Sequence, residues 1–379
     1  MAIEIKRVEN RRELKQFIEF HYDLYAGNQY DAPTLFSDDM TTLSKDKNAA
    51  FEFCEAEYFL ALRDGKVVGR VAAIINHKAN KRWEQERVRF GWIDFIDDRE
   101  VSAALLQAVA DYGREKGMKE VVGPLGFTDF DPEGMLIDGF EELNTMATIY
   151  NYPYYPQHLE ALGFQKDNDY VEYKIFVPKE VPERLSKISA MIGNRYQLHV
   201  RTLTRKEINE GKGHEIFHLI NETFKDIYGF SELSDRQVDQ YVKMYLPLAD
   251  LNLIPIIEDW STPEHRLVGV GISIPSLSRA LQKCRRGRLL PFGWWHVLRA
   301  LKMHKTKIVD LEMIGILPEY RKKGANALLF NHLIPLYVKY GIEWGESQVE
   351  METNENVQGQ WQFFETVNHK RRRCFVKGI

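Results

Sequence analysis

The sequence predicts an α/β protein built from two domains. Its 379 residues are about twice the ~100–200 residues of a single domain. Hydrophobic residues make up 44% and charged residues 28%, a balance typical of a globular protein with enough apolar residues for two cores. An order of strand, helix and hairpin also occurs twice along the chain. We therefore expect a first domain at residues 1–190 and a second at 191–379.

The first half is expected to contain a strand, a helix and a hairpin, followed by a strand–helix–strand unit. The hairpin is predicted where the turn Asp64-Gly65 joins two runs rich in β-formers. Apolar residues at helical spacing predict the helices. The expected elements are a strand at 3–8, a helix at 11–25, strands at 56–62, 67–75 and 89–95, a helix at 98–117 and a strand at 121–124.

The second half repeats this order from Leu198 onward, which suggests an internal duplication. The segment 177–182, with the amphipathic run 183–193 behind it, joins the two halves. The expected elements are strands at 198–203, 253–257, 267–274, 308–316 and 347–352, helices at 214–227, 235–246, 324–339 and 355–367, and an inserted segment at 276–305.

Charge and cysteine content restrict the class of protein. A net charge of −4 argues against a protein that coats nucleic acid over its whole surface. The cysteines Cys54, Cys284 and Cys374 are odd in number and far apart, so neither a disulfide framework nor a metal cage is expected. No segment approaches the ~18 apolar residues of a membrane span, and the N-terminus lacks a signal-peptide pattern. We expect a cytoplasmic protein.

The most informative segment is a strand, a basic turn and a helix start at residues 314–329. Pro318 ends the strand, and Gly324 allows a close turn, so that the amides of residues 322–327 are expected to face one concavity. Such a concavity at a helix N-terminus binds phosphate, and the flanking cations add positive charge. The other interpretation is a solvated basic turn that caps an ordinary helix.

The run Arg321-Lys322-Lys323-Gly324-Ala325-Asn326 resembles the acyl-CoA-binding signature of the GNAT superfamily of N-acetyltransferases, Arg/Gln-x-x-Gly-x-Gly/Ala. It matches at Arg321 and Gly324, whereas Asn326 replaces the usual small residue. The resemblance covers about residues 198–379. It implies a tandem GNAT protein, in which each domain is a mixed, mostly antiparallel sheet flanked by helices.

The same resemblance implies acetyl-CoA or another acyl-CoA as donor, no metal, and direct attack of an acceptor amine on the thioester. A backbone N–H near Ile316 would polarise the thioester carbonyl. The residues expected to bind the cofactor are Ile314, Gly315, Ile316, Arg321, Lys322, Lys323, Gly324, Ala325, Asn326, Ala327, Asn354 and Asn356.

Glu312 is the candidate catalytic base. Alternation along the strand 309–316 is expected to place Asp310, Glu312 and Ile314 on one face, where burial would raise the pKa of a carboxyl toward that of a general base. A solvated strand carboxylate is the alternative. The helix expected at 355–367 has no tyrosine, so general acid catalysis from that position is not expected.

The first half resembles this superfamily in element order only. Where the phosphate turn should lie, residues 96–102 are acidic and contain no glycine, so anions would be repelled. We expect a degenerate GNAT-like domain without the CoA signature, which forms a wall of the acceptor site. An unrelated α/β domain remains the alternative.

The long loop 123–156 is rich in Gly, Pro, Asp and Tyr, and long ordered loops in compact domains are often functional. It is similar to the corresponding loop of a bacterial branch of tandem GNAT proteins. Asp129, Asn151 and Tyr155 are the expected acceptor-site residues, with Trp294 from the inserted segment. Alternatively, the loop covers a sheet edge.

Residues 279–307 contain nine cations and no acid, interleaved with aromatic and aliphatic residues. This pattern suits an anionic acceptor or an anionic membrane surface. A packed helix face with solvated charge opposite is the alternative.

Together these features predict an acyl-CoA-dependent N-acyltransferase, with acetyl as the expected acyl group and a small-molecule or peptide amine as acceptor. Nucleic acid is not an expected partner. Two alternatives stay open at this point: a transferase that uses an aminoacyl or long-chain acyl donor, and a non-catalytic module that binds CoA or another anion.

Overall fold

In the computed structural model, which describes residues 2–247, 249–302 and 305–379, the first half of the chain follows the predicted order of strand, helix and hairpin. Its strands are β1 (Glu4–Arg7), β2 (Cys54–Arg63), β3 (Lys66–Asn76), β4 (Arg87–Phe95), β5 (Glu120–Gly123), β6 (Met135–Asp138) and β7 (Gln165–Phe176). Its helices are α1 (Arg11–Leu24), α2 (Phe36–Thr42), α3 (His77–Arg82), α4 (Arg99–Glu115) and α5 (Tyr154–Ala161).

The second half repeats the order with more helices. Its helices are α6 (Glu183–Tyr196), α7 (Arg205–Glu207), α8 (Gly213–Phe224), α9 (Asp235–Tyr245), α10 (Ser278–Leu281), α11 (Gly293–Lys302), α12 (Pro318–Arg321), α13 (Asn326–Tyr340) and α14 (Glu355–Gln358). Its strands are β8 (Leu198–Thr202), β9 (Pro255–Asp259), β10 (Arg266–Pro275), β11 (Ile308–Ile316), β12 (Trp344–Ser347), β13 (Glu350–Met351) and β14 (Thr366–Gly378).

Local sequence explains the ends of several helices. The Asn10 side chain accepts from the first amides of α1, and Ser234 with Gln237 forms a capping box at the start of α9. Helix α13 ends at Gly341, whose φ of 72° is strained for residues with a Cβ.

Within the described part of the chain, all strands join one mixed sheet of fourteen strands. Twelve of them follow the order β1-β2-β3-β4-β5-β14-β7-β12-β11-β10-β9-β8, while β6 pairs with β14 and β13 pairs with β7. The pairs β4–β5 and β11–β12 are parallel, and the other pairs are antiparallel. This architecture confirms the predicted fold class of mixed, mostly antiparallel sheets flanked by helices.

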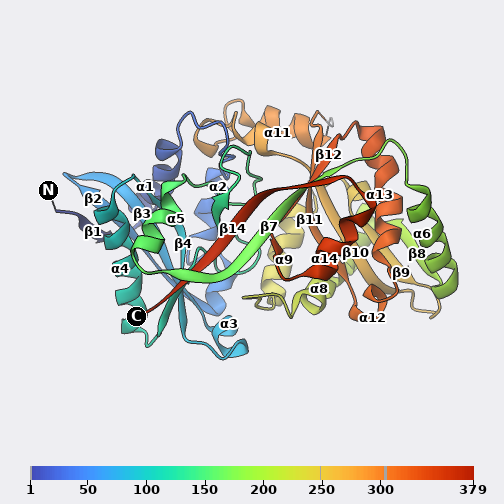
Figure 1. The fold of residues 1–379 in the computed structure, drawn as a ribbon, viewed down its shortest axis with the longest axis horizontal. Coiled ribbons are helices and arrows are strands. Elements are labelled where there is room, and N and C mark those ends of the chain that lie inside the picture. The colour runs from blue at the N-terminus through green and yellow to red at the C-terminus, as the bar shows by residue number, and fades with distance from the viewer. Residues whose placement is uncertain (1, 248, 303–304) are drawn as a thin grey trace.

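The two halves exchange strands at the centre of the sheet. Strand β14, at the end of the chain, pairs with β5 and β6 of the first half, whereas β7 of the first half pairs with β12 and β13 of the second. The two long strands also pair with each other and cross from one half into the other (Figure 1). The sheet is therefore continuous across the boundary expected near residue 190, and the two-domain division stays a prediction.

Four expectations about local structure were wrong or incomplete. The helix expected at 355–367 ends as α14 at Gln358, a 3-10 turn follows at Gly359–Phe363, and β14 begins at Thr366. The long strands β7 and β14 were not predicted. Part of the loop 123–156 forms β6 and α5, and the inserted segment 276–305 contains α10 and α11.

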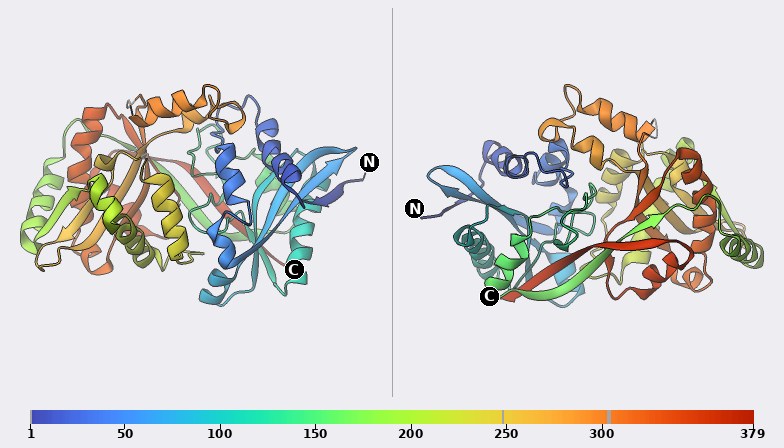
Figure 2. Two further views of the ribbon diagram at one scale, coloured as in Figure 1. Left: turned by 180° about the vertical axis from the view of Figure 1, so that it is seen from behind. Right: turned by 45° about the horizontal axis from the view of Figure 1, so that its top comes forward.

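Helices cover both faces of the sheet in the first half (Figure 2). Alternate residues of β3 explain this, because Val71 and Ala73 pack with α4, whereas Ala72 and Ile74 pack with α1 and α2. In the second half one large core packs α6, α8 and α13 against the strands β9, β10 and β11.

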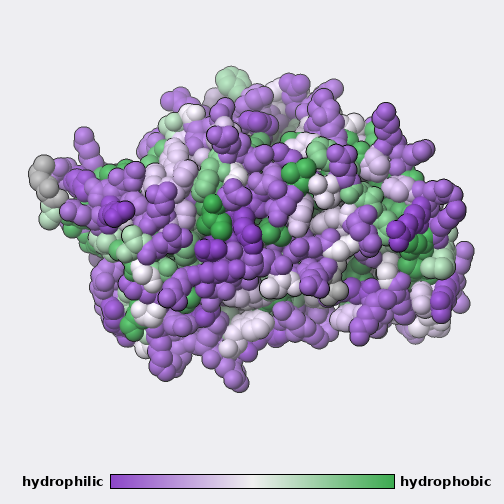
Figure 3. Space-filling view, viewed as in Figure 1, coloured by the Kyte–Doolittle hydropathy of each residue, from purple (hydrophilic) through white to green (hydrophobic). Residues whose placement is uncertain are grey.

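The surface seen in Figure 3 is mainly hydrophilic, with hydrophobic residues scattered over it. Among the residues that the structure describes, no helix has the length and apolar character needed to cross a bilayer.

Candidate functional site

A gap opens in the sheet of the second half where β11 and β12 separate. The two strands pair in parallel only from Ile308 to Leu311 and from Trp344 to Ser347. Beyond these residues β11 continues along β10 to Ile316, while β13 pairs with β7 instead. Next to the basic turn, one edge of β11 is therefore left without a neighbouring strand among the described residues.

The backbone of β11 presents donors to this gap. The N–H of Leu317 donates to the carbonyl of Val268, 3.0 Å away, so Leu317 and Gly315 direct their N–H groups toward β10. Because alternate residues of an antiparallel strand face opposite edges, the N–H groups of Ile314 and Ile316 face the gap. The Ile316 carbonyl accepts a hydrogen bond from the Arg321 side chain at 3.1 Å.

A β-bulge interrupts β11 at Glu312, since Met313 pairs with Ile272 while Leu311 pairs with the adjacent Ser273. The bulge changes which side chains share a face. A Cβ at Gly315 would lie 2.8 Å from Thr223 of α8, so Gly315 rather than Ile314 faces α8. The expectation that Ile314 shares a face with Asp310 and Glu312 was wrong, because alternation does not continue through a bulge.

Asp310, which is buried, and Glu312, which is partly buried, lie at the start of the gap. Both carboxylate oxygens of Asp310, and Oε1 of Glu312, are buried without a hydrogen-bond partner among the described residues. Burial raises the pKa of Glu312 to about 7. Burial, with the carboxyls of Glu312 and Glu346 nearby, raises the pKa of Asp310 well above its usual value. Glu312 can therefore exchange its proton near neutral pH.

Behind this pair lies a fully buried charge cluster that joins both halves. Lys370 Nζ of β14 lies 2.8 Å from Glu172 Oε2 of β7 and 2.7 Å from Glu346 Oε1 of β12. Arg372 also pairs with Glu172, and His369 Nε2 lies 2.6 Å from Glu346 Oε1. Burial alone would lower the pKa of Lys370, but the carboxylates of Glu172 and Glu346 outweigh it and raise that pKa. Lys370 therefore stays charged.

The basic turn after β11 differs from the open cradle of amides expected at residues 322–327. The N–H groups of residues 322–325 donate to carbonyls of Pro318, Tyr320 and Arg321, and that of Ala327 donates to Gly324. The reason is the helical turn α12, which forms directly before the expected cradle and uses these donors. The Asn326 N–H makes none of these bonds, and Gly324 has the positive φ of 78° that favours glycine.

Cations surround this turn. The Lys323 ammonium lies over the rings of Tyr320 and Tyr196, at 4.2 and 4.8 Å from their centroids, and Lys322 is exposed. Arg321 donates to the carbonyls of Ile316 and Thr223. Arg321 thus joins the end of β11 to α8. Lys322 and Lys323 are therefore the cations of this turn that can bind an anion.

The opposite side of the gap carries unpaired polar groups. Gln348, Glu350 and Gln360 each have a buried polar atom without a partner in the described part of the chain. Burial raises the pKa of Glu350 to about 7. Asn354 caps α14 by accepting from the Val357 N–H at 3.3 Å. Asn356 belongs to the same helix, but its side chain lies outside the described residues.

In the first half, tyrosines occupy the position that corresponds to the gap between β11 and β12. Strands β4 and β5 also pair in parallel, from Arg87 to Arg89, and then separate. The backbone N–H of Phe95 donates to the Tyr155 hydroxyl at 3.1 Å, and the Phe95 carbonyl accepts from Tyr154 at 2.6 Å. Asp98 caps the start of α4. The side chains of Tyr154, Tyr155 and Asp98 therefore occupy the positions at which an anion or the backbone of a ligand would otherwise bind.

The residues predicted for the acceptor site do not gather in one place. Asp129 accepts from the Ser231 N–H, Asn151 bonds both backbone groups of Leu136, and the Tyr155 hydroxyl contacts Tyr25 and Asp94. Trp294 lies exposed on α11. Roles for these four residues in substrate binding stay predictions.

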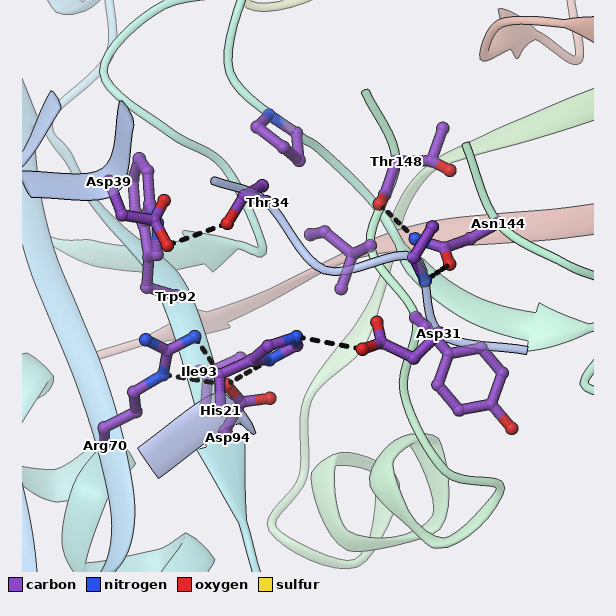
Figure 4. Close-up of a pocket in the computed structure, with 14 residues that line it drawn as sticks. His21, Asp31, Thr34, Asp39, Arg70, Trp92, Ile93, Asp94, Asn144 and Thr148 are labelled. Atoms are coloured by element: carbon purple, nitrogen blue, oxygen red, sulfur yellow. Dashed lines mark hydrogen bonds and ion pairs between the residues drawn. The ribbon is translucent and has the colours of Figure 1, made fainter. Parts of the chain in front are cut away.

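The structure also forms a small polar cavity of about 70 Å³ in the first half, which the sequence did not suggest (Figure 4). His21 lies between Asp31 and Asp94, at 3.4 and 3.1 Å, and Arg70 contacts Asp94 at 2.7 Å. Burial alone would lower the pKa of His21, but the two carboxylates raise it to about 10. Asp39 also lines the cavity. The lining therefore contains three carboxylates and two cations, the cations being His21 and Arg70. In the sequence, the one indication of this cavity was a charged residue within an apolar run, as at Arg70.

A loop connects this cavity to the gap. Asn144 and Thr148 line the cavity, and Thr145 between them donates to the Gln348 side chain at 3.2 Å. Within the described ranges, no group of three or more His, Cys, Asp or Glu side chains is arranged to hold a metal ion.

The sequence matches no protein-family model. It is 26% identical over 380 residues to Protein YghO of Escherichia coli (strain K12), covering 98% of this chain and 94% of that protein. It is also 25% identical over 335 residues to the bacterial ceramide synthase of Caulobacter vibrioides (strain NA1000 / CB15N), covering 85% of this chain and 82% of that protein.

Two solved structures resemble the fold across nearly the whole chain. A tandem GNAT protein from the clavulanic acid biosynthesis pathway superposes with a TM-score of 0.56 at 10% identity, covering 100% of this chain and 98% of that one. A GCN5-related glucosamine N-acetyltransferase region of a fungal multi-domain GH3 β-N-acetylglucosaminidase superposes with a TM-score of 0.52 at 12% identity, covering 99% of this chain and 38% of that one. The resemblance seen around Arg321 is thus confirmed for the fold: the chain has the tandem GNAT fold.

Proposed function

We propose that this protein is an acyl-CoA-dependent N-acyltransferase that works at the gap between β11 and β12. The observation that carries the proposal is the meeting of three features at this gap. These are a strand edge with unpaired N–H groups at Ile314 and Ile316, a partly buried carboxyl at Glu312 with a pKa of about 7, and a basic turn at residues 321–323. Acyl transfer needs an oxyanion donor, a proton acceptor and an anchor for the donor phosphates.

In the proposed reaction the acceptor amine attacks the thioester carbonyl directly. The N–H of Ile316 stabilises the oxygen as negative charge develops on it. The new C–N bond forms, the C–S bond breaks, and the thiolate leaves with its electron pair. Glu312 takes the proton that the amine nitrogen loses, directly or through a water molecule.

The donor would lie along β11, with its phosphates at the basic turn. The exposed strand edge, the positive φ of Gly324 and the lysines of the turn fit such a ligand, although most of the turn amides are engaged within α12. We therefore assign phosphate binding mainly to Lys322 and Lys323, with the N–H of Asn326. We assign Arg321 to holding the turn against Ile316. Gly315, Ala325, Ala327, Asn354 and Asn356 complete the proposed donor site.

The acyl group and acceptor are open to a finer proposal. A ceramide is a fatty acyl amide of a long-chain amine, and a relative at 25% identity is named a bacterial ceramide synthase. This favours a long-chain acyl donor and a long-chain amine for this chain, as the second candidate beside acetyl transfer.

A binding experiment tests the core of the proposal. Calorimetric titration with acetyl-CoA and with a long-chain acyl-CoA should give saturable binding, and the double variant Lys322→Glu/Lys323→Glu should weaken it at least tenfold. Lys339→Glu, an exposed charge reversal at the far end of α13, is the matched control and should bind normally. Unchanged affinity in the double variant would refute this donor site.

Turnover separates the remaining alternatives. Mass spectrometry of products after incubation with each donor and a panel of short and long-chain amines identifies the acyl group and acceptor. Tight CoA binding with no amide product from any pair would favour the non-catalytic module. We also propose a cytoplasmic location, because all three cysteines are buried and unpaired, which suits a reducing compartment.

A further inference from the structure

Five large apolar side chains lie exposed within nine residues around the start of α11. Leu290 is 76% exposed, Phe292 75%, Trp294 47%, Trp295 42% and Leu298 38%. Single exposed apolar residues are normal on a protein, but a contiguous group marks an interaction surface. We call this group the α11 apolar face.

Folding does not require the α11 apolar face, because the other side of the helix already packs against the protein. Ala300 is buried, and Val297 and Leu301 pack with a cluster that includes Leu35 of the first half. Arg286 pairs with Asp23, and Arg288 lies 2.7 Å from Glu19, which ties the segment before α11 to α1. The helix is thus held in place with its apolar face outward, at the upper edge of the molecule in Figure 1.

Positive charge borders this face. Residues 279–307 contain nine cations and no acid. Arg286, Arg288 and Lys307 are engaged with carboxylates of other elements. Lys283, Arg285 and Arg299 are exposed, and their side chains form no hydrogen bond or ion pair with any of the described residues. Their charge is therefore available to a partner.

We propose that the α11 apolar face docks this protein onto the anionic surface of a lipid bilayer. Tryptophan and phenylalanine partition to the boundary between head groups and acyl chains, and adjacent lysines and arginines are attracted to anionic lipids. A second copy of the chain is the weaker occupant, because a two-fold contact would bring two sets of unneutralised cations together. The inference is independent of the proposed acyl transfer, since it concerns binding alone.

Vesicle co-sedimentation tests this surface with the full chain and no acyl donor. We expect the protein to bind vesicles of phosphatidylcholine with one quarter phosphatidylglycerol, to bind pure phosphatidylcholine vesicles at least tenfold less, and to be released from the anionic vesicles by 0.5 M NaCl. The double variant Leu290→Ser/Phe292→Ser should lower the partition coefficient at least tenfold. Both side chains are about three-quarters exposed, so the variant should fold normally.

A charge variant and two controls complete the test. Lys283→Glu/Arg285→Glu/Arg299→Glu should remove the preference for anionic vesicles. Met191→Ser, which removes a 57% exposed apolar side chain from α6, and Lys339→Glu on α13 should both bind like the unmodified protein. Equal binding to both vesicle types, or unchanged binding by the double variant, would overturn the proposal. A dimer in light scattering that Leu290→Ser/Phe292→Ser dissociates, without vesicle binding, would also overturn it in favour of a contact between copies.

Discussion

Asp310 and Glu346 lie directly opposite each other on the parallel strands β11 and β12, one rung before these strands separate. Both side chains are buried, yet only Glu346 reaches a cation, Lys370 Nζ at 2.7 Å. The cluster thus neutralises Glu346, whereas neither Asp310 nor Glu312 forms an ion pair within the described part of the chain. Burial without such a partner is the physical reason why the pKa of each of these two carboxyls is raised.

Glu312→Gln should lower kcat/KM about 10²-fold or more at pH 8, because the amide cannot accept the amine proton. The pKa of Glu312 is about 7, and the base must be ionised, so activity of the unmodified protein should rise with pH through 7 and level off above it. Steady-state kinetics from pH 5.5 to 9 would measure this rise of kcat/KM with pH.

Glu264→Gln is the control for that experiment, since Glu264 is exposed in the turn before β10 and should leave activity unchanged. If Glu312→Gln keeps full activity and the same pH profile, Glu350, whose pKa is also raised to about 7, becomes the residue to substitute next.

Lys370→Met should destabilise the protein by about 3–5 kcal/mol, because it leaves two buried carboxylates without their shared cation. The free energy of unfolding, from urea denaturation followed by fluorescence, measures the loss. The same substitution at the exposed Lys339 should change it by less than about 0.5 kcal/mol. Similar values for the two variants would show that the cluster contributes no net stability.

Separating the chain into residues 1–180 and 181–379 should give two pieces that do not fold alone. The first piece lacks β14, which pairs with β5, β6 and β7, and the second lacks β7, which pairs with β12. Unpaired sheet edges of this length aggregate. Co-expression should yield a soluble complex in which both pieces co-purify.

Circular dichroism with thermal unfolding would measure the folding of each piece. A cooperative transition in residues 1–180 alone would contradict this prediction and show that the first half is an autonomous domain.

His21→Asn should lower the free energy of unfolding most at low pH. The pKa of His21 is raised to about 10 by Asp31 and Asp94, against ~6.5 in an unfolded chain. The stability contributed by this charge is therefore fully present below pH 6.5 and is lost as the pH rises toward 10. The difference in unfolding free energy between variant and unmodified protein should shrink between pH 6.5 and 9.

The same substitution at His77, an exposed residue paired with Glu55, is the comparison and should show a much smaller trend. A difference at His21 that stays constant with pH would mean that packing, and not charge, accounts for its contribution.

Much of the fold could be predicted because its signals are local. The Asp64-Gly65 turn, the capping residues of α1 and α9 and the run from Ile308 to Ile316 each determine structure through neighbours in sequence. The strands β7 and β14 could not be predicted in the same way. They carry buried ionic groups such as Glu172, Lys370 and Arg372, whose partners lie on other strands and break the apolar pattern of a buried strand.

The same distinction, between residues close in sequence and residues from distant elements, applies to the candidate site. Arg321, Gly324 and Glu312 could be proposed as site residues from the sequence, because a short motif and its strand are contiguous there. The polar cavity around His21 was missed, since Asp31, Arg70 and Asp94 come from separate elements and show no common spacing.

The sequence by itself determined the α/β class, the repeated element order and the basic turn beside a strand, since each of these depends on residues a few positions apart. Only the tertiary structure decided that the two halves exchange β7 and β14, that β11 and β12 separate after Leu311, and that a bulge interrupts β11 at Glu312. These features arise from pairing between distant strands and from burial, which raises the pKa of Asp310 and of Glu312.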